Sequence, residues 1–163
     1  RAKELNPRNT WAYGYLGIVY RAKGQIDKAV EEFKRGLKVN PKHDWLYLEL
    51  GNTYRAKRDL DNAMWAYSRA KELNPRNTWA YGYLGIVYRA KGQMDKAVEE
   101  FKRGLKVNPK HDWLYVELGN TYRAKGDINK AVWAYKKALE IRPNNSVAYR
   151  NLKALGQSSA LEP

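Results

Sequence analysis

Tryptophan and arginine recur in this chain at fixed intervals, and both side chains bind other molecules without forming covalent bonds. With tyrosine, they supply much of the binding energy at protein interfaces. Four of the six tryptophans are evenly spaced, and an arginine follows each of these four ten positions later: Trp11, Trp45, Trp79 and Trp113, then Arg21, Arg55, Arg89 and Arg123. The pattern indicates a recognition surface that is repeated along the chain.

The residue combinations that carry catalysis are missing from the sequence. The chain has no cysteine and two histidines, His43 and His111, which stand in equivalent turns far apart in the chain and so form no local metal pair. No nucleophile–base pair, phosphate-binding loop, zinc spacing or calcium loop appears. The sequence predicts a protein that is not an enzyme and that holds neither a metal nor a cofactor.

Helices are predicted to position the aromatic residues. The motif Tyr-x-x-Leu-Gly-x-x-Tyr spans Tyr13–Tyr20, so its named residues lie at i, i+3, i+4 and i+7 on one helix face. A second helix then carries Ala29 and Phe33 until Pro41 ends it. The motif returns at a constant interval, beginning at Tyr47, Tyr81 and Tyr115. A constant period of this size predicts a stack of equivalent helix pairs.

The period divides the chain into units. Residues 1–9 are identical to residues 69–77, so they are predicted to be the tail of a truncated repeat. Asn9 or Thr10 is expected to cap the first helix of unit one, and Asp44 that of unit two. The predicted organisation is a repeat tail at 1–9, four units at 10–43, 44–77, 78–111 and 112–145, a capping helix at 146–156 and a disordered tail at 157–163.

The turn inside each unit also follows a rule, with one exception. Glycine ends the first helix of three units, at Gly24, Gly92 and Gly126, and it readily takes the left-handed conformation found at helix ends. Arg58 stands at this place in unit two. A left-handed backbone at Arg58 is expected to cost about 1 kcal/mol.

The units resemble the tetratricopeptide repeat, whose signature of Trp-x2-Leu-Gly-x2-Tyr, then Ala-x3-Phe, then Pro, recurs about every 34 residues. Unit one carries Tyr13, Leu16-Gly17, Tyr20, Ala29, Phe33 and Pro41, and the second helices of later units carry Ala63, Tyr67 and Pro75, then Ala97, Phe101 and Pro109, then Ala131, Tyr135 and Pro143. Tyrosine replaces the first Trp throughout. The resemblance implies an all-α fold, a right-handed α-solenoid of antiparallel helix pairs with four full units and a C-terminal capping helix. It also implies a concave groove, lined by the first helices, that binds peptides or assembles complexes.

The sequence also repeats with a longer period, equal to two units. Residues 1–68 and 69–136 are identical at 60 of 68 positions, so units one and three share one type and units two and four another. Either a recent tandem duplication or deliberate construction would produce this near-identity.

Each first helix carries a second line of residues opposite its core face, because successive residues turn by about 100°. The line is aromatic and apolar in units one and three, and polar in units two and four. By resemblance to the family, the predicted groove positions are Trp11, Gly14, Tyr15, Ile18 and Arg21; Trp45, Glu49, Asn52 and Arg55; Trp79, Gly82, Tyr83, Ile86 and Arg89; and Trp113, Glu117, Asn120 and Arg123. Gly14 and Gly82 are predicted to leave a gap where a ligand backbone approaches closely.

These positions also have structural interpretations. The tryptophans can wedge between neighbouring first helices and only pack, which is the commoner role of large aromatic residues at helical spacing. The arginines lie in the last turn of a helix, where a cation gains about 0.3–1 kcal/mol from the helix dipole. A clamp for the terminal carboxylate of a chaperone peptide is rejected, because Glu49 and Glu117 would repel that carboxylate.

Two further tryptophans, Trp65 and Trp133, stand on second helices. Units one and three have glutamate there, at Glu31 and Glu99, and a site that accepts glutamate is normally in contact with water. Trp65 and Trp133 are therefore predicted to be partly exposed, either as isolated surface aromatics or as a self-association patch.

The formal net charge of +14 favours acidic partners. The first functional hypothesis is a non-catalytic scaffold that binds an extended acidic or aromatic peptide in the groove. The alternatives are binding of single-stranded RNA by stacked aromatic rings, and a structural or engineered array without a dedicated ligand. No membrane-spanning run and no signal sequence are present, so no membrane partner and a cytoplasmic location are predicted, while a native leader could be missing.

Overall fold

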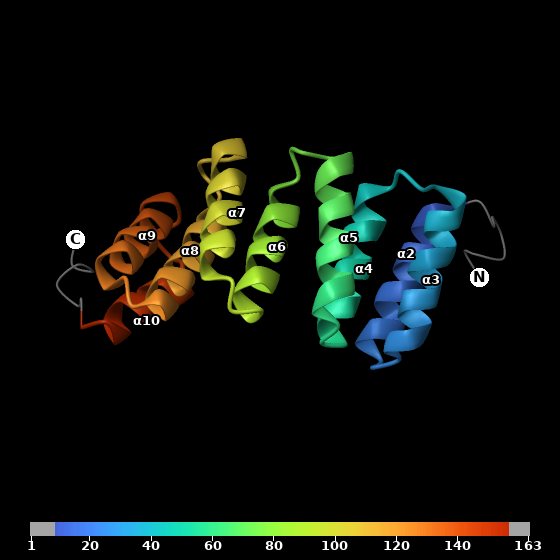
Figure 1. Ribbon diagram of the computed structural model, residues 1–163, viewed down its shortest axis with the longest axis horizontal. Helices are drawn as coiled ribbons and strands as arrows, with labels where there is room; N and C mark the ends of the chain where they lie inside the picture. The colour runs from blue at the N-terminus through green and yellow to red at the C-terminus, as the bar shows by residue number, and fades with distance from the viewer. Residues whose placement is uncertain (1–8, 157–163) are drawn as a thin grey trace. The chain divides into compact units, whose positions relative to one another are not determined.

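The computed structural model describes residues 9–156 of the chain, and these residues form helices joined by short turns (Figure 1). The sequence expectations for a repeat tail at 1–9 and a disordered end at 157–163 fall almost entirely outside this part. No strand occurs within residues 9–156, which confirms the predicted all-α class. The helices are α2 (Thr10–Ala22), α3 (Ile26–Val39), α4 (Asp44–Ala56), α5 (Leu60–Leu73), α6 (Thr78–Ala90), α7 (Met94–Val107), α8 (Asp112–Lys125), α9 (Ile128–Ile141) and α10 (Ser146–Ala154).

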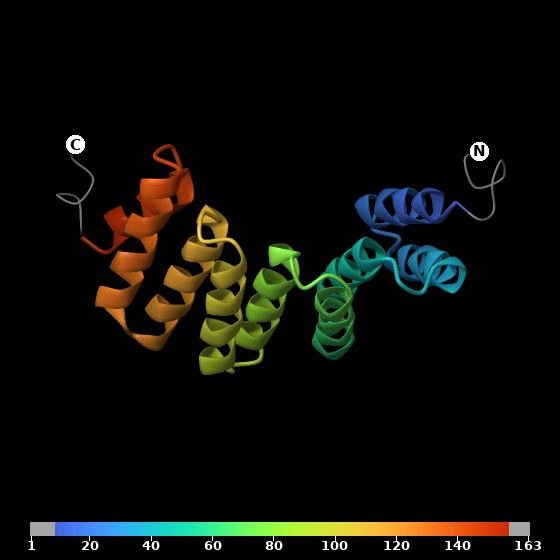
Figure 2. The same cartoon turned by 90° about the horizontal axis from the view of Figure 1, so that it is seen from above.

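Consecutive helices pack as pairs, and small residues allow them to approach. The α2 helix lies against α3 and α4 lies against α5, as both views show (Figures 1 and 2). The ring of Phe33 on α3 covers Gly17 on α2, where an added Cβ would lie 2.6 Å from the ring. Tyr67 on α5 covers Gly51 on α4 in the same way, at 2.5 Å. The Leu-Gly of the repeat motif therefore makes room for the aromatic residue of the following helix.

The same arrangement forms the core of the later pairs. Phe101 covers Gly85 and Tyr135 covers Gly119, and both aromatic side chains are fully buried. Leucines and small residues of neighbouring helices complete this core, including Leu114, Leu118, Ala131, Ala138 and Leu152. Burial of these apolar side chains is the main force that holds the helix pairs together.

Helix ends follow the sequence rules in most places. Asn9 caps α2, because its Oδ1 accepts hydrogen bonds from the backbone N–H groups of Trp11 and Ala12. Asp44 was expected to cap α4, and this expectation is wrong. The helix begins at Asp44 itself, with His43 in the cap position, and the Asp44 carboxylate accepts a hydrogen bond from Asn74 Nδ2 at 2.8 Å.

The left-handed turn residues lie where the sequence placed them. Gly24, Gly92 and Gly126 have φ angles of 73°, 74° and 83°. Arg58 takes the same conformation, with φ of 63°, although it carries a side chain. Unit two therefore holds a strained turn that the other units avoid.

Contacts within the chain gather into two compact units, which divide between Ala80 and Tyr81. The first holds α2 to α5, and the second holds α7 to α10 with most of α6. Within residues 9–156, no helix is both long enough and apolar enough to cross a membrane.

Candidate interaction surface

Four aromatic side chains form a contiguous cluster in the first compact unit. The ring centroids of Trp11 and Trp45 lie 4.9 Å apart, and Tyr15 lies 6.5 Å from Trp11 and 5.8 Å from Trp45. His43 meets Trp11 edge-on at 4.7 Å. Trp11 is 49% exposed and Tyr15 is 61% exposed, whereas Trp45 is partly buried. The cluster therefore presents an exposed aromatic surface on α2, and the rings of this surface pack against Trp45 of α4.

The gap predicted beside Gly14 does not exist, because Trp45 fills it. A Cβ added to Gly14 would lie 2.3 Å from Cζ3 of Trp45 and 2.9 Å from Cδ2 of Leu46. Gly82 is covered in the same way by Trp113, at 2.2 Å. Glycine at these positions gives the indole of the next first helix a place to pack, and a ligand backbone cannot approach there. Trp45 and Trp113 thus follow the packing interpretation.

The second compact unit repeats part of the cluster. Tyr83 and Trp113 have ring centroids 5.4 Å apart, and His111 lies 5.9 Å from Trp113. Trp79, just before this unit in the chain, is 45% exposed, while Tyr83 is only partly exposed. The isoleucines of the aromatic line, Ile18 and Ile86, are partly buried, and Ile86 packs against the core.

Arg21 reaches from α2 to α4. Its Nη2 forms an ion pair with Glu49 Oε2 at 2.7 Å, and its Nη1 donates to the Glu49 carbonyl oxygen at 3.1 Å and to Thr53 Oγ1 at 3.2 Å. Arg89 makes the same three contacts with Glu117 and Thr121. The charges of these two arginines are therefore balanced by carboxylates inside the protein.

The polar positions of α4 and α8 are also bonded internally. Asn52 Oδ1 accepts a hydrogen bond from the hydroxyl of Tyr67 at 2.8 Å, and Asn120 Oδ1 accepts one from Tyr135 at the same distance. The amide of Asn151 on α10 also donates to Asn120. Asn52 and Asn120 thus link the first helix of units two and four to the buried tyrosine on the second helix of the same unit.

The pairing of Glu49 also bears on the predicted absence of a carboxylate clamp. The ion pair with Arg21 weakens the repulsion that Glu49 was predicted to exert on a ligand carboxylate. The absence of a carboxylate clamp stays a prediction. Arg55 and Arg123 lie exposed in the last turns of α4 and α8, which fits the helix-dipole interpretation.

Trp65 and Trp133 lie on second helices, apart from the aromatic cluster. They are 48% and 47% exposed, as the glutamates at equivalent positions led us to expect. Each meets a tyrosine of its partner helix edge-on, Trp65 with Tyr47 at 5.7 Å and Trp133 with Tyr115 at 5.9 Å. Their part in self-association stays a prediction.

The histidines belong to the aromatic cluster, which the sequence reasoning missed. His43 and His111 each pack near the indole two residues later in the chain. Partial burial lowers the pKa of both imidazoles, and the neighbouring Asp44 and Asp112 oppose this shift. The signal was their identical place before the Trp of both even units.

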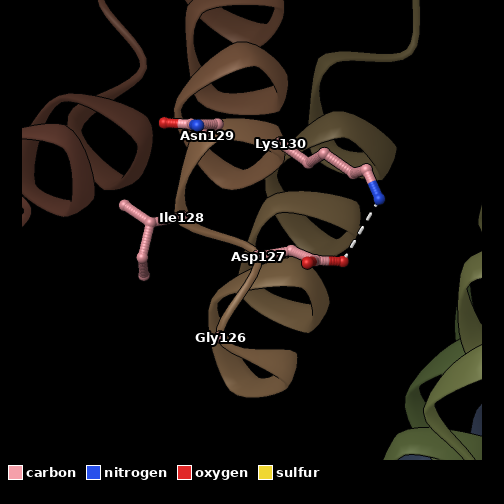
Figure 3. A pocket seen from close by; sticks show the side chains of 5 residues that line it. All are labelled: Gly126, Asp127, Ile128, Asn129 and Lys130. Carbon is pink, nitrogen blue, oxygen red and sulfur yellow. Dashed lines mark hydrogen bonds and ion pairs between the residues drawn. The ribbon is translucent and has the colours of Figure 1, made fainter.

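Open depressions occur at helix–helix turns. One is lined by Gly126, Asp127, Ile128, Asn129 and Lys130, between α8 and α9 (Figure 3). Its charged groups pair with each other, since Lys130 Nζ lies 3.3 Å from Asp127 Oδ2. None of the predicted groove residues lines this depression. In the part of the chain that the structure describes, no three His, Cys, Asp or Glu side chains gather as metal ligands would.

The chain is similar to several proteins of known structure. The crystal structure of MamA shares 29% sequence identity, with a TM-score of 0.77, over 89% of this chain and 85% of MamA. A second crystal structure of MamA has the same identity and a TM-score of 0.74, over 88% of this chain and 79% of that one. PilF of Pseudomonas aeruginosa has a TM-score of 0.81 at 17% identity, over 98% of this chain and 75% of PilF, and so shares the fold alone. No curated protein matches the sequence.

These neighbours are helical solenoids of the tetratricopeptide type, as the resemblance implied. The tetratricopeptide fold is typically a non-catalytic scaffold for protein interactions. A family model described as the cilia and flagella-associated protein 70 C-terminal domain, itself a tetratricopeptide-repeat domain, matches residues 1–162. The chain belongs to this family.

Proposed function

We propose that this chain binds an extended peptide segment with aromatic or apolar side chains on the aromatic surface of α2. The observation that carries the proposal is the exposure of Trp11 and Tyr15 on a cluster whose inner members are held in place. Exposed aromatic residues are costly to leave in water, and at interfaces they dominate binding energy.

The arrangement of the cluster supports binding by preorganisation. Trp45 is seated over Gly14, and the Trp11 ring lies against it. The rings therefore lose little conformational freedom when a ligand arrives, which lowers the cost of binding. The α2 residue Trp11 has a counterpart in Trp79 on α6, which is also exposed.

The preference for an acidic ligand does not follow from this surface. Arg21 and Arg89 are paired with Glu49 and Glu117, so the surface offers a ligand little positive charge from them. The same pairing weighs against single-stranded RNA, which needs cations beside its stacking rings to follow the phosphates. The aromatic character of the ligand is thus the better supported part of the hypothesis.

The chain offers a matched pair of variants to test the proposal. Trp11→Ala and Trp65→Ala each remove an indole that is about half exposed, 49% and 48%, but on different surfaces. A phage-displayed peptide library selected on the intact chain would supply ligands, and their affinities would be measured by calorimetry. We expect Trp11→Ala to weaken binding by about tenfold or more, a loss typical of an aromatic hot spot, and Trp65→Ala to leave it unchanged.

Two results would contradict the proposal. Equal loss in both variants would show that the selected peptides bind exposed indoles without regard to surface. Loss in Trp65→Ala alone would move the binding surface to the second helices. Circular dichroism of each variant would establish that the helices remain folded.

A further inference from the structure

Exposed lysines recur at a spacing of four residues on α3 and α7 and in the turns that follow them. Lys34, Lys38 and Lys42 are exposed and follow one another at every fourth position, and Lys102, Lys106 and Lys110 repeat the arrangement. We refer to these two sets as the basic stripes. Within residues 9–156, none of these six ammonium groups forms an ion pair, a side-chain hydrogen bond or a ring contact.

Carboxylates near the stripes are already engaged elsewhere. Asp27, at the start of α3, pairs with Lys57 at 2.7 Å, and Glu31 pairs with Arg35. The equivalent carboxylates of α7 are engaged in the same way, in the pairs Asp95–Lys125 and Glu99–Arg103. Arg35 is shared between Glu31 and Glu32, and Arg103 between Glu99 and Glu100, so these acids pair with arginine and, among the described residues, the stripe lysines form no ion pair of their own.

The even helix pairs lack such a stripe. The positions equivalent to Lys34, Lys38 and Lys42 are Ser68, Glu72 and Arg76 around α5, and Lys136, Glu140 and Asn144 around α9. Glu72 pairs with Arg69 and Glu140 with Lys137, each at 2.6 Å. The basic stripes are thus a feature of the odd pairs, on the second helices rather than on the aromatic surface.

We propose that each basic stripe binds an acidic helical segment of a partner protein, in which glutamate or aspartate recurs at every fourth residue. The two stripe lysines on each helix are separated by about 6 Å along its axis, and the third lies in the turn that follows. Carboxylates at the same spacing on a second helix advance by an equal distance, so the two rows can pair step by step. Val39 and Val107, 41% and 40% exposed beside the stripes, add an apolar contact.

Other anionic partners fit the stripes less well. Neither α3 nor α7, both of which the structure describes in full, carries an exposed aromatic side chain, so single-stranded nucleic acid has no ring to stack on. Each stripe consists of lysine alone, without the Arg, Asn or Gln side chains that read base edges. A membrane-bound helix needs a broad apolar face, but the apolar face of α3 is buried through Phe33 and Leu37.

The proposal is independent of the peptide-binding function and has its own test. The probe is a fluorescent alanine-based peptide of about 20 residues with glutamate at every fourth position, long enough to be helical. Binding to the intact chain is followed by anisotropy at low and at physiological salt. One variant replaces all six stripe lysines by glutamine. The matched control removes six positive charges elsewhere, through substitution by glutamine of Lys23, Arg58, Arg76, Lys136, Arg150 and Lys153.

We expect the stripe variant to bind the probe at least about tenfold more weakly than the control variant, because close charge pairs are lost and not only net charge. Equal weakening in both variants would overturn the proposal in favour of general charge attraction. A peptide of the same composition with clustered glutamates should bind more weakly than the regular one. Equal or tighter binding of double-stranded DNA, or of vesicles containing phosphatidylserine, through the same lysines would overturn the choice of an acidic helix as partner.

Discussion

The first helices of the odd-numbered units, α2 and α6, differ from those of the even-numbered units, α4 and α8. The difference lies in how the side chain at the tryptophan position of the next unit packs against each helix. In α2 and α6, Gly14 and Gly82 leave room, and the following Trp45 and Trp113 are partly buried. The equivalent residues of α4 and α8 are Leu48 and Val116, which are themselves buried. The residues that then stand at the tryptophan position, Trp79 and Val147, are exposed, at 45% for Trp79.

The burial of a tryptophan therefore follows the residue 31 positions before it. Trp45 and Trp113 follow a glycine and pack on it, whereas Trp79 follows Leu48 and is exposed. The identity of the tryptophan itself carries no such information. Each prediction below changes one side of the comparison and measures the response.

Adding a side chain at Gly14, on which the Trp45 ring packs, should have the largest effect on stability. We expect Gly14→Ala to lower the free energy of unfolding by about 1–3 kcal/mol, because the new Cβ must displace Trp45 or Leu46. Urea denaturation measures the loss, and a red shift in fluorescence reports the displaced indole. In a Trp45→Ala background the loss should shrink by at least half. A gain in stability on Gly14→Ala, as at an ordinary helical glycine, would contradict the close packing of Trp45 against Gly14.

Neutralising the glutamate that pairs with an arginine of the preceding unit should have the second largest effect on stability. We expect Glu49→Gln to cost about 1–2 kcal/mol, because Arg21 loses a charged partner in a site where the Glu49 side chain is 14% exposed. Glu117→Gln should behave alike. Glu31→Gln is the control, since that glutamate pairs with Arg35 on an exposed surface of one helix. Similar losses for Glu49 and Glu31 in thermal unfolding would show that the inter-helix pair has no special weight.

The two even units can also be made alike. We expect Arg58→Gly to raise the free energy of unfolding by about 1 kcal/mol, because glycine takes the left-handed conformation at no steric cost. The reciprocal change, Gly126→Arg, should lower it by a similar amount. Chemical denaturation of both variants checks the pair. If neither change has an effect, the turn relaxes around its side chain.

The smallest expected effect is the pH dependence of stability that comes from His43 and His111, the last residues of units one and three. Burial lowers the pKa of His43 and His111 in the folded chain below the ordinary 6.5, so the unfolded chain binds protons first as pH falls. Their contribution to stability is therefore complete above about pH 6.5 and is lost as the solution becomes more acidic. A thermal melt series from neutral to mildly acid pH measures this loss. The double variant His43→Gln and His111→Gln should show a weaker pH dependence.

Local sequence rules predicted the helices well. Motif spacing identified Tyr13 and Gly17 as buried residues of α2, while Leu16 and Tyr20 are partly buried. Glycine identified three left-handed turns, and Arg58 takes the left-handed conformation for which the sequence predicted only a conditional cost. The partial exposure of Trp65 also followed from the glutamate at its equivalent position. These features depend on neighbours within one turn or one repeat, which the sequence displays directly.

Contacts between first helices could not be predicted as well. The seat of Trp45 over Gly14 depends on side chains 31 positions apart, and helical periodicity does not give their register. The pairing of Arg21 with Glu49 depends on the same register, although a signal existed. A glutamate follows Arg21 and Arg89 by 28 positions, whereas Tyr83 stands at that distance from Arg55. The ligand surface remains a proposal, because no rule of sequence names a ligand.

The contacts of Arg21 have a consequence for how such an array can lengthen or shorten during evolution. Deletion of one repeat, residues 44–77, would place Tyr83 at the position now held by Glu49 and leave the guanidinium without its acid. Deletion of two consecutive repeats would restore an arginine and a glutamate in register. Recombination should therefore preserve stability when it inserts or removes repeats two at a time, which makes the double repeat the heritable module of the chain.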